Sequence, residues 1–187
     1  MIRHVALYHI EDDGLVNHCT RNGERVGHTW ARAQSHALYG MLHVLEEMEG
    51  GDPERQSIID LMRRVGRGLK IHQDAETGLW RNLVDHPAAR LEVTGTAGFT
   101  YVYGRGVREG WLAADEFGDM VRRGREGLKL CYWRNGFAAS CRGTYWGLDP
   151  VHYLARPQGW SKLPQALMAL AMTRHSVMKS SSHTVKQ

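Results

Sequence analysis

Cysteine and long hydrophobic runs are both scarce in this 187-residue chain. The three cysteines, Cys19, Cys131 and Cys141, cannot all pair with one another and form no CxxC motif, which argues against a disulfide framework or a structural zinc site. Apolar runs are only a few residues long, far short of the roughly 20 residues that cross a bilayer. The first residues contain no apolar core of the signal-peptide kind. We therefore expect a cytoplasmic protein with reduced thiols and no membrane partner.

A concentrated surface of one charge is also missing. The net charge is +4, but Lys and Arg are interleaved with Asp and Glu along most of the chain. The densest basic cluster, residues 122–125, is followed at once by Glu126, which is typical of a solvated helix face and not of a nucleic-acid-binding surface. We expect no nucleic-acid partner. With 42% hydrophobic and 24% charged residues, the composition is that of one globular domain.

Apolar residues recur at the three- and four-residue spacing of amphipathic helices. This spacing predicts helices over residues 30–48, 53–69, 96–106, 114–130 and 163–173. We expect the first two to form an antiparallel hairpin, with Asp52 as the N-cap of the second, Pro53 as its first residue, and Leu163 on the apolar face of the fifth. Two long segments rich in glycine and aromatic residues, 74–90 and 132–160, lie between helices. Loops of this kind commonly build a site at one end of a helical scaffold.

The best candidate binding residues lie at the start of the first predicted helix. Arg32 carries a fork of hydrogen-bond donors that suits a carboxylate or sugar hydroxyls, and Trp30 offers a flat apolar face for a sugar ring. Both lie near the helix N-terminus, where free N–H groups and the helix dipole favour an anion. His36 lies one turn beyond Arg32, so the two share a helix face. The alternative is that Trp30 packs in the core and Arg32 forms a salt bridge.

The eleven histidines do not predict a metal centre. His36 and His43 are two helical turns apart, without the i, i+4 spacing or the acidic partner of a zinc motif. The chain has no Gly-x-Ser-x-Gly elbow and no P-loop. We expect neither a metal nor a cofactor.

Five ordered segments resemble glycoside hydrolase families 88 and 105, the unsaturated glucuronyl and rhamnogalacturonyl hydrolases. Residues 30–40, with WARAQ followed by ALYG, resemble the family signature that begins Trp-Ala-Arg-Gly-Gln. Residues 13–18, DGLVNH, resemble the family's Gly-Leu-x-x-His loop. The other segments follow in the family's order: QDAETGLW and LVD within 73–85, the stretch 92–112, and CRGT at 141–144 with YLARP at 153–157.

This resemblance implies an all-α fold, a toroid of six helical hairpins written (α/α)6, around a sugar cleft. The toroid needs about twice this chain, so five helices correspond to its C-terminal half. We expect a partial (α/α)6 glycoside hydrolase domain over residues 1–175 and a disordered tail at 176–187. A helical half-ring is a poor isolated globule, so its exposed inner face predicts association.

The chemistry that the resemblance implies is hydration of a C4=C5 double bond. In the family, a single aspartate protonates this bond in a terminal unsaturated uronic acid, water adds at C5, and the sugar leaves without help from a metal. That aspartate lies upstream of the Gly-Leu-x-x-His loop. Asp12 and Asp13 belong to the loop itself, so we assign no catalytic residue and expect the chain to be inactive alone.

The resemblance also implies which residues bind the substrate. His18 corresponds to the family's histidine near the uronate, Trp30 to its stacking tryptophan, and Arg32 to the arginine that holds the uronate. Gly143 and Thr144 correspond, more loosely, to the loop that closes the carboxylate end.

Two departures from the family pattern indicate a changed pocket. Ala33 replaces the usual glycine. His36 stands where a second tryptophan is common, and it keeps a ring while adding a titratable group.

Two functions therefore remain in competition. The first is half of an unsaturated uronyl hydrolase for lyase-generated pectin or glycosaminoglycan fragments, completed by an N-terminal half or by a second copy in a homo-oligomer. The second is a non-catalytic sugar-binding or helical interaction module derived from that fold. A catalytic aspartate encoded upstream favours the first, and equal binding of saturated and unsaturated sugars favours the second.

Overall fold

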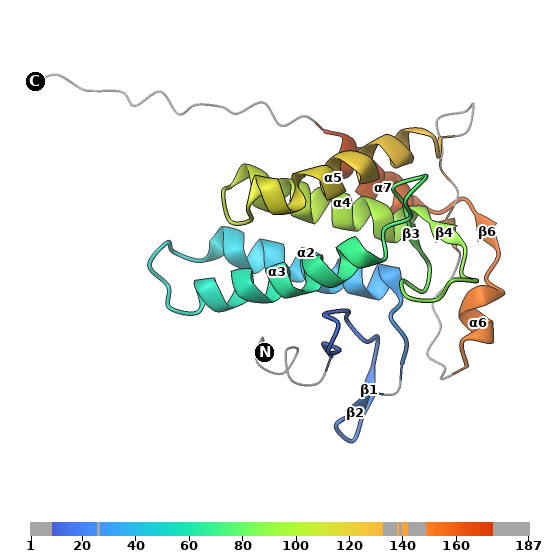
Figure 1. Ribbon diagram of the computed structural model, residues 1–187, viewed down its shortest axis with the longest axis horizontal. Coiled ribbons are helices and arrows are strands. Elements are labelled where there is room, and N and C mark those ends of the chain that lie inside the picture. Colours follow the sequence, from blue (N-terminus) through green and yellow to red (C-terminus); the bar gives the residue numbers. More distant parts are fainter. Residues whose placement is uncertain (1–8, 26, 133–137, 139, 142–148, 174–187) are drawn as a thin grey trace, which may run out of the picture.

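The computed structural model describes residues 9–25, 27–132, 138, 140–141 and 149–173. Helices dominate this part of the chain (Figure 1): α2 (Ala31–Glu47), α3 (Arg55–Ile71), α4 (Val93–Arg108), α5 (Ala114–Lys129), the short α6 (Val151–Leu154) and α7 (Lys162–Met172). The segments outside the helices contain three antiparallel pairs of two-residue strands: β1 (Thr20–Arg21) with β2 (Glu24–Arg25), β3 (Trp80–Arg81) with β4 (Leu91–Glu92), and β5 (Ser140–Cys141) with β6 (Gln158–Gly159). The predicted all-α class is confirmed.

Helices α2 and α3 form the predicted hairpin. Each buries an apolar stripe at helical spacing in one continuous core: Leu38, Leu42 and Leu45 of α2, and Ile58, Met62, Val65 and Leu69 of α3. The predicted start of the second helix is wrong by two residues, because α3 begins at Arg55 and Pro53 lies before it. Asp52 instead closes a turn, in which its Oδ1 accepts a hydrogen bond from the Glu54 backbone N–H at 2.8 Å.

Helix α4 lies at the centre and packs against α2, α5 and α7. It begins at Val93, three residues earlier than predicted. Residues 93–96 are Val, Thr, Gly and Thr, which are weak helix formers, but the Glu92 carboxylate accepts a hydrogen bond from the Gly95 N–H at 2.6 Å and caps the helix. A Cβ at Gly95 would lie 2.6 Å from the Ala31 Cβ. The missing side chain therefore lets the first turns of α2 and α4 approach closely.

Helices α5 and α7 match their predicted segments to within one residue at all four ends, but one residue of α7 faces differently from the prediction. Leu163 was expected on the apolar face, but it is 37% exposed, and Leu167 and Met168 are buried instead. The apolar face of α7 is thus rotated toward Pro164, Leu167 and Met168. The predicted tail at residues 176–187 lies outside the described residues.

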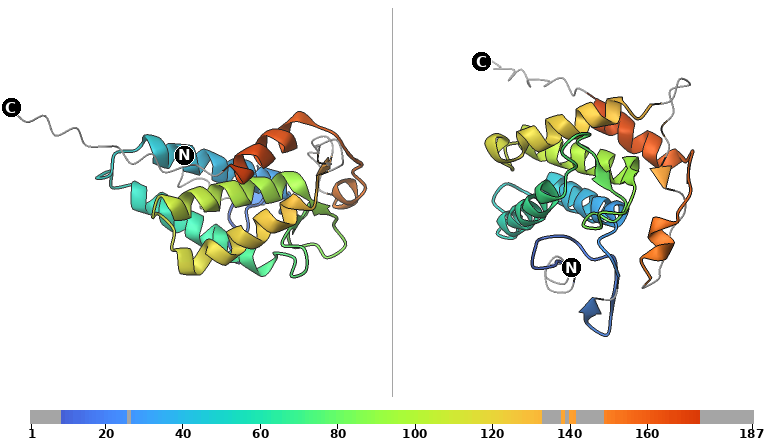
Figure 2. Two further views of the ribbon diagram at one scale, coloured as in Figure 1. Left: turned by 90° about the horizontal axis from the view of Figure 1, so that it is seen from above. Right: turned by 45° about the vertical axis from the view of Figure 1, so that its right-hand side comes forward.

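The loop and strands between α3 and α4, and the segment before α7, lie at the end of the helices where α2 and α4 begin. Figures 1 and 2 show β3, β4, β6 and α6 at this end, and in the view of Figure 1 residues 9–25 lie below α2 and α3. The loop before β3 is anchored by Trp80, which is fully buried and donates from Nε1 to the Leu69 carbonyl at 2.7 Å. Within the described ranges, we find no helix long and apolar enough to cross a membrane.

Candidate functional site

Three segments that are distant in sequence meet where α2 begins. The segment before α2 pairs with the loop after β3 through the bridge between Trp30 and Leu83. The Ala31 N–H donates to the Asn82 carbonyl at 2.9 Å, and the Val84 N–H donates to the Thr29 carbonyl at 3.0 Å. Helix α6 is the third segment, and its Tyr153 and Leu154 pack in one apolar cluster with Trp30 and Leu83. The backbone alone therefore fixes the position of the first turn of α2 against the loop.

The Trp30 indole lies in the middle of this junction. It is 5% exposed and packs in a small apolar cluster with Leu83, Ala89 and Tyr153. Its Nε1–H donates a hydrogen bond to the Asn82 Oδ1 at 3.0 Å. Trp30 thus belongs to a core in this structure, and little of its ring surface faces solvent.

Arg32 lies directly over this indole. Its guanidinium carbon is 4.5 Å from the ring centroid, a cation–π stack. The residue is 8% exposed, so its side chain is held in place and not spread into solvent. His36, one turn further along α2, is exposed. The pKa of His36 is lowered from its ordinary value, first by partial shielding from water and second by the positive charge of Arg32.

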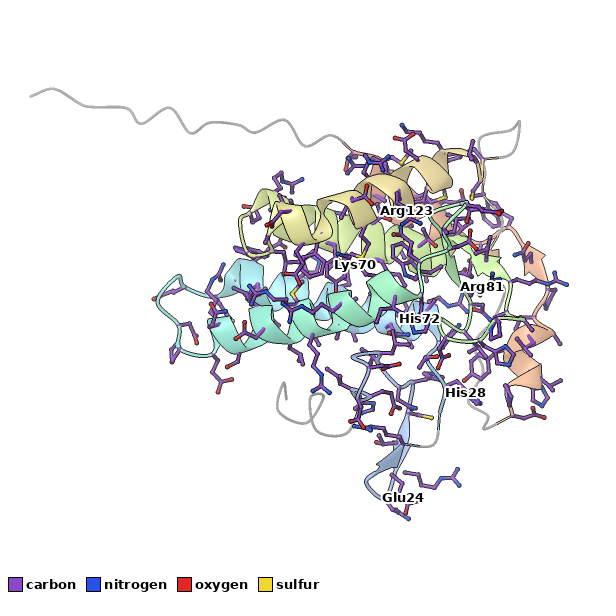
Figure 3. The ribbon with its side chains drawn as sticks, viewed as in Figure 1. Glu24, His28, Lys70, His72, Arg81 and Arg123 are labelled. Carbon is purple, nitrogen blue, oxygen red and sulfur yellow. The ribbon has the colours of Figure 1, made fainter. Side chains whose placement is uncertain are left out.

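The His18 ring packs against the same indole in a T-shaped contact. The two ring centroids are 4.9 Å apart at an interplanar angle of 67°. The His18 Nδ1 and the Tyr153 hydroxyl lie 2.8 Å apart in a hydrogen bond. The ring of His28 stands edge-on to Tyr153 at 5.5 Å, and Figure 3 shows His28 between the hairpin that carries Glu24 and the loop that carries Arg81.

Burial lowers the pKa of His18, and the nearby His28 and His9 lower it further. An unfolded chain would then take up a proton near the ordinary histidine pKa of about 6.5, while the folded chain resists protonation. We expect the free energy of unfolding to fall as the pH drops below about 6.5, toward the lower pKa of the folded state. Urea unfolding at several pH values measures this loss, and H18Q should weaken the pH dependence. A His18 that titrates above about 6.5 by NMR would contradict the expectation.

An open hollow of about 460 Å³ adjoins His28. Its lining includes Glu11, Asp12, Asp13, Asn17, Gly27, His28, Thr29 and Asp85. The Thr29 hydroxyl donates a hydrogen bond to the Asp85 carboxylate, and the Asp13 carboxylate accepts one from the Leu15 N–H at 2.9 Å. These two carboxylates therefore serve local turns and contacts.

Another hollow, of about 470 Å³, lies between residues 75–78 and α5. It shares no lining residue with the Trp30 junction and is bordered by ion-paired surface residues such as Lys129 and Glu126. We place the candidate site at the Trp30 junction, because the buried aromatic rings of Trp30 and Tyr153, the buried Arg32 guanidinium and the half-buried His18 imidazole converge there.

Comparison with known proteins identifies the family. The sequence profile of Glycosyl Hydrolase Family 88 matches residues 6–171. The chain belongs to glycoside hydrolase family 88. An unsaturated 3S-rhamnoglycuronyl hydrolase from Alteromonas sp. (strain LOR) is 31% identical over 105 residues, which is 55% of this chain and 25% of that protein.

Solved structures show the same fold. A possible member of glycoside hydrolase family 105 from Salmonella enterica has 24% identity and a TM-score of 0.83, over 91% of this chain and 46% of that one. A possible member of the same family from Klebsiella pneumoniae has 25% identity and a TM-score of 0.82, again over 91% and 46%. The toroid class predicted from the resemblance is confirmed, and this family 88 chain spans about half the length of these solved relatives. That it is the C-terminal half stays a prediction.

The structure brings together three of the six predicted binding residues, His18, Trp30 and Arg32. The other three are His36, which lies exposed one turn away, and Gly143 and Thr144, which lie outside the described residues. In the part of this family 88 chain that the structure describes, no group of three His, Cys, Asp or Glu residues is placed to hold a metal ion.

Two residues of the junction were missed as site residues. Tyr153 stands in the YLARP segment, whose resemblance to the family marked the segment without assigning the tyrosine a role. Asn82 stands between the GLW and LVD parts of the 73–85 segment. Membership of these segments was the signal that could have pointed to both.

Proposed function

We propose that this chain supplies the uronide-binding half of an unsaturated uronyl hydrolase. The observation that carries the proposal is the buried Arg32 guanidinium stacked at 4.5 Å over Trp30, with the His18 ring in a T-shaped contact with the same indole. A guanidinium is a planar fork of donors that matches a carboxylate. Arg32 is also the second residue of α2, where the helix dipole favours an anion.

In this proposal the three residues have different roles. Arg32 binds the carboxylate of the terminal uronic acid, and His18 binds beside it. Trp30, which is buried, supports the Arg32 guanidinium from below and presents only its rim to the sugar. A cation that is already held in its binding geometry loses little side-chain entropy when the substrate arrives.

The proposed substrate is an oligosaccharide that a lyase has released from pectin or a glycosaminoglycan, because such a product carries a C4=C5 unsaturated uronate at one end. The aspartate that protonates the double bond comes from outside this chain, from an N-terminal half or from a second copy. We therefore propose that the chain binds this sugar but does not hydrolyse it alone. The unsaturated 3S-rhamnoglycuronyl hydrolase named above supports this substrate class by similarity.

Calorimetric titration of the chain with an unsaturated uronyl disaccharide and with its saturated counterpart tests the proposal. We expect binding of the unsaturated sugar, weaker binding of the saturated one, and no loss of the ultraviolet absorbance of the double bond. Equal affinity for both sugars would favour a general sugar-binding module. Absence of binding to either sugar would contradict the assignment of a uronide site to this chain.

A further inference from the structure

We infer that Asn82 is a positioning residue that fixes the plane of the Trp30 indole and, through the backbone of Tyr153, the place of the His18 ring. Its consequence for sugar affinity rests on the proposed function, whereas its effect on the two rings does not. Asn82 contacts neither Arg32 nor His18 by any hydrogen bond that we observe, so it would act through its neighbours.

The geometry of Asn82 leaves its side chain one orientation. The residue is 2% exposed. Its Oδ1 accepts the Trp30 Nε1–H at 3.0 Å, and its Nδ2 donates to the Tyr153 carbonyl at 3.0 Å. An indole nitrogen only donates and a backbone carbonyl only accepts, so these partners fix which amide atom is which. Turning the amide over would break both hydrogen bonds in a buried place, which is costly.

The backbone of Asn82 is held as firmly as its side chain. Its N–H donates to the Arg90 carbonyl at 2.8 Å, and its carbonyl accepts the Ala31 N–H at 2.9 Å. One residue thus connects the first turn of α2, the end of the loop after β3, and helix α6. Movement of Asn82 would therefore disturb hydrogen bonds to all three segments.

Two arms lead from Asn82 to the candidate binding groups. One arm runs through the Trp30 indole, which carries the Arg32 guanidinium on its face and makes a T-shaped contact with the His18 ring. The other runs through Tyr153, whose hydroxyl is hydrogen-bonded to the His18 Nδ1. His18 is reached by both arms, so its environment should report the state of Asn82 most directly.

Substitutions separate the two arms. N82A removes both hydrogen bonds. N82D keeps an acceptor for the indole but places carboxylate oxygens against the Tyr153 carbonyl, so it breaks only the second arm. W30F removes the indole donor and also assigns the Trp30 signal in NMR spectra.

Gln73 offers a matched control. It is also a buried amide, and its Nε2 donates to the Gly78 carbonyl at 2.8 Å and the Met120 carbonyl at 3.0 Å. These partners lie away from the Trp30 junction. Q73A should therefore cost stability as N82A does, without changing the Trp30 and His18 rings.

The test is NMR of the isotope-labelled full chain. In N82A we expect the Trp30 indole N–H to exchange with solvent about tenfold faster or more, and the pKa of His18 to rise toward its ordinary value as the ring loses its shielded place. In N82D, which also serves if N82A fails to fold, we expect the His18 signals to move while the indole N–H stays protected. The inference would be overturned if N82A kept the wild-type indole N–H exchange rate and the wild-type His18 pKa, or if Q73A changed both quantities as much as N82A does.

Sugar titration of the same variants adds a second readout. If the wild-type chain binds an unsaturated uronyl disaccharide, N82A should weaken that affinity about tenfold and Q73A should leave it unchanged. If the wild-type chain binds no uronide, the proposed function fails, and the two ring readouts still decide whether Asn82 is a positioning residue.

Discussion

R32A should lower the affinity of the chain for an unsaturated uronide by about 10- to 100-fold. A hydrogen bond to a charged group contributes about 1.5–3 kcal/mol, and each 1.4 kcal/mol is about tenfold in affinity. R32K should lose less, because lysine keeps the charge while losing the planar fork that stacks on Trp30 and meets a carboxylate with two donors. Calorimetric titration of each variant with an unsaturated uronyl disaccharide measures the effect.

Arg67 supplies the control for this experiment. It lies on α3, is largely exposed, and pairs with Glu116 at 2.6 Å. R67A removes the same charge from the chain as R32A, so it accounts for any long-range electrostatic contribution. Equal affinities of R32A and the wild-type chain for the disaccharide would contradict the role of Arg32. Equal losses of affinity in R32A and R67A would mean that only the overall charge of the chain matters.

G127A should destabilise the fold, whereas G118A on the same helix should stabilise it. A Cβ at Gly127 would lie 2.1 Å from the Thr77 carbonyl oxygen, a backbone atom that cannot turn aside. We expect a loss of about 1–3 kcal/mol in the free energy of unfolding. A Cβ at Gly118 meets no atom within 4 Å, so alanine there should gain about 0.5–1 kcal/mol from its better helix propensity.

Urea unfolding of both variants measures this contrast between two glycines of α5. The contrast tests whether the loop at residues 74–78 packs directly against the C-terminal end of α5. Destabilisation of the same size in both variants would mean that helix propensity, and not the approach of Thr77, decides the outcome at Gly127.

The helices could be predicted from sequence because their apolar stripes follow a regular period, but their ends depend on contacts that this period does not contain. Helix α4 begins three residues before its predicted start, because Glu92 caps it and because the weak helix formers of its first turn are buried between other helices. Pro53 lies outside α3 because Asp52 closes a turn before that helix. The exposure of Leu163 depends on which side of α7 faces α4.

The candidate site was predictable in part, from short sequence motifs and not from an apolar period. His18, Trp30 and Arg32 lie in short segments with a recognisable pattern, and the structure brings them together. The sequence offered a stacking face or a core position for Trp30, and it left the choice open. The structure shows a buried indole that lies beneath Arg32. Asn82 and Tyr153 reach the site from loops without a period, and no local pattern states that Tyr153 meets a histidine 135 positions away.

We propose that this chain binds the unsaturated uronide but takes the catalytic aspartate from outside. The most direct measurement is the ultraviolet absorbance of an unsaturated uronyl disaccharide. It should be followed with this chain alone and with this chain co-expressed with the segment encoded immediately upstream of the Met1 codon. We expect no loss of absorbance with the chain alone, loss with the pair, and a much slower loss when the pair carries R32A. Consumption of the double bond by this chain alone, or an upstream segment without an aspartate-bearing helical half, would contradict the claim.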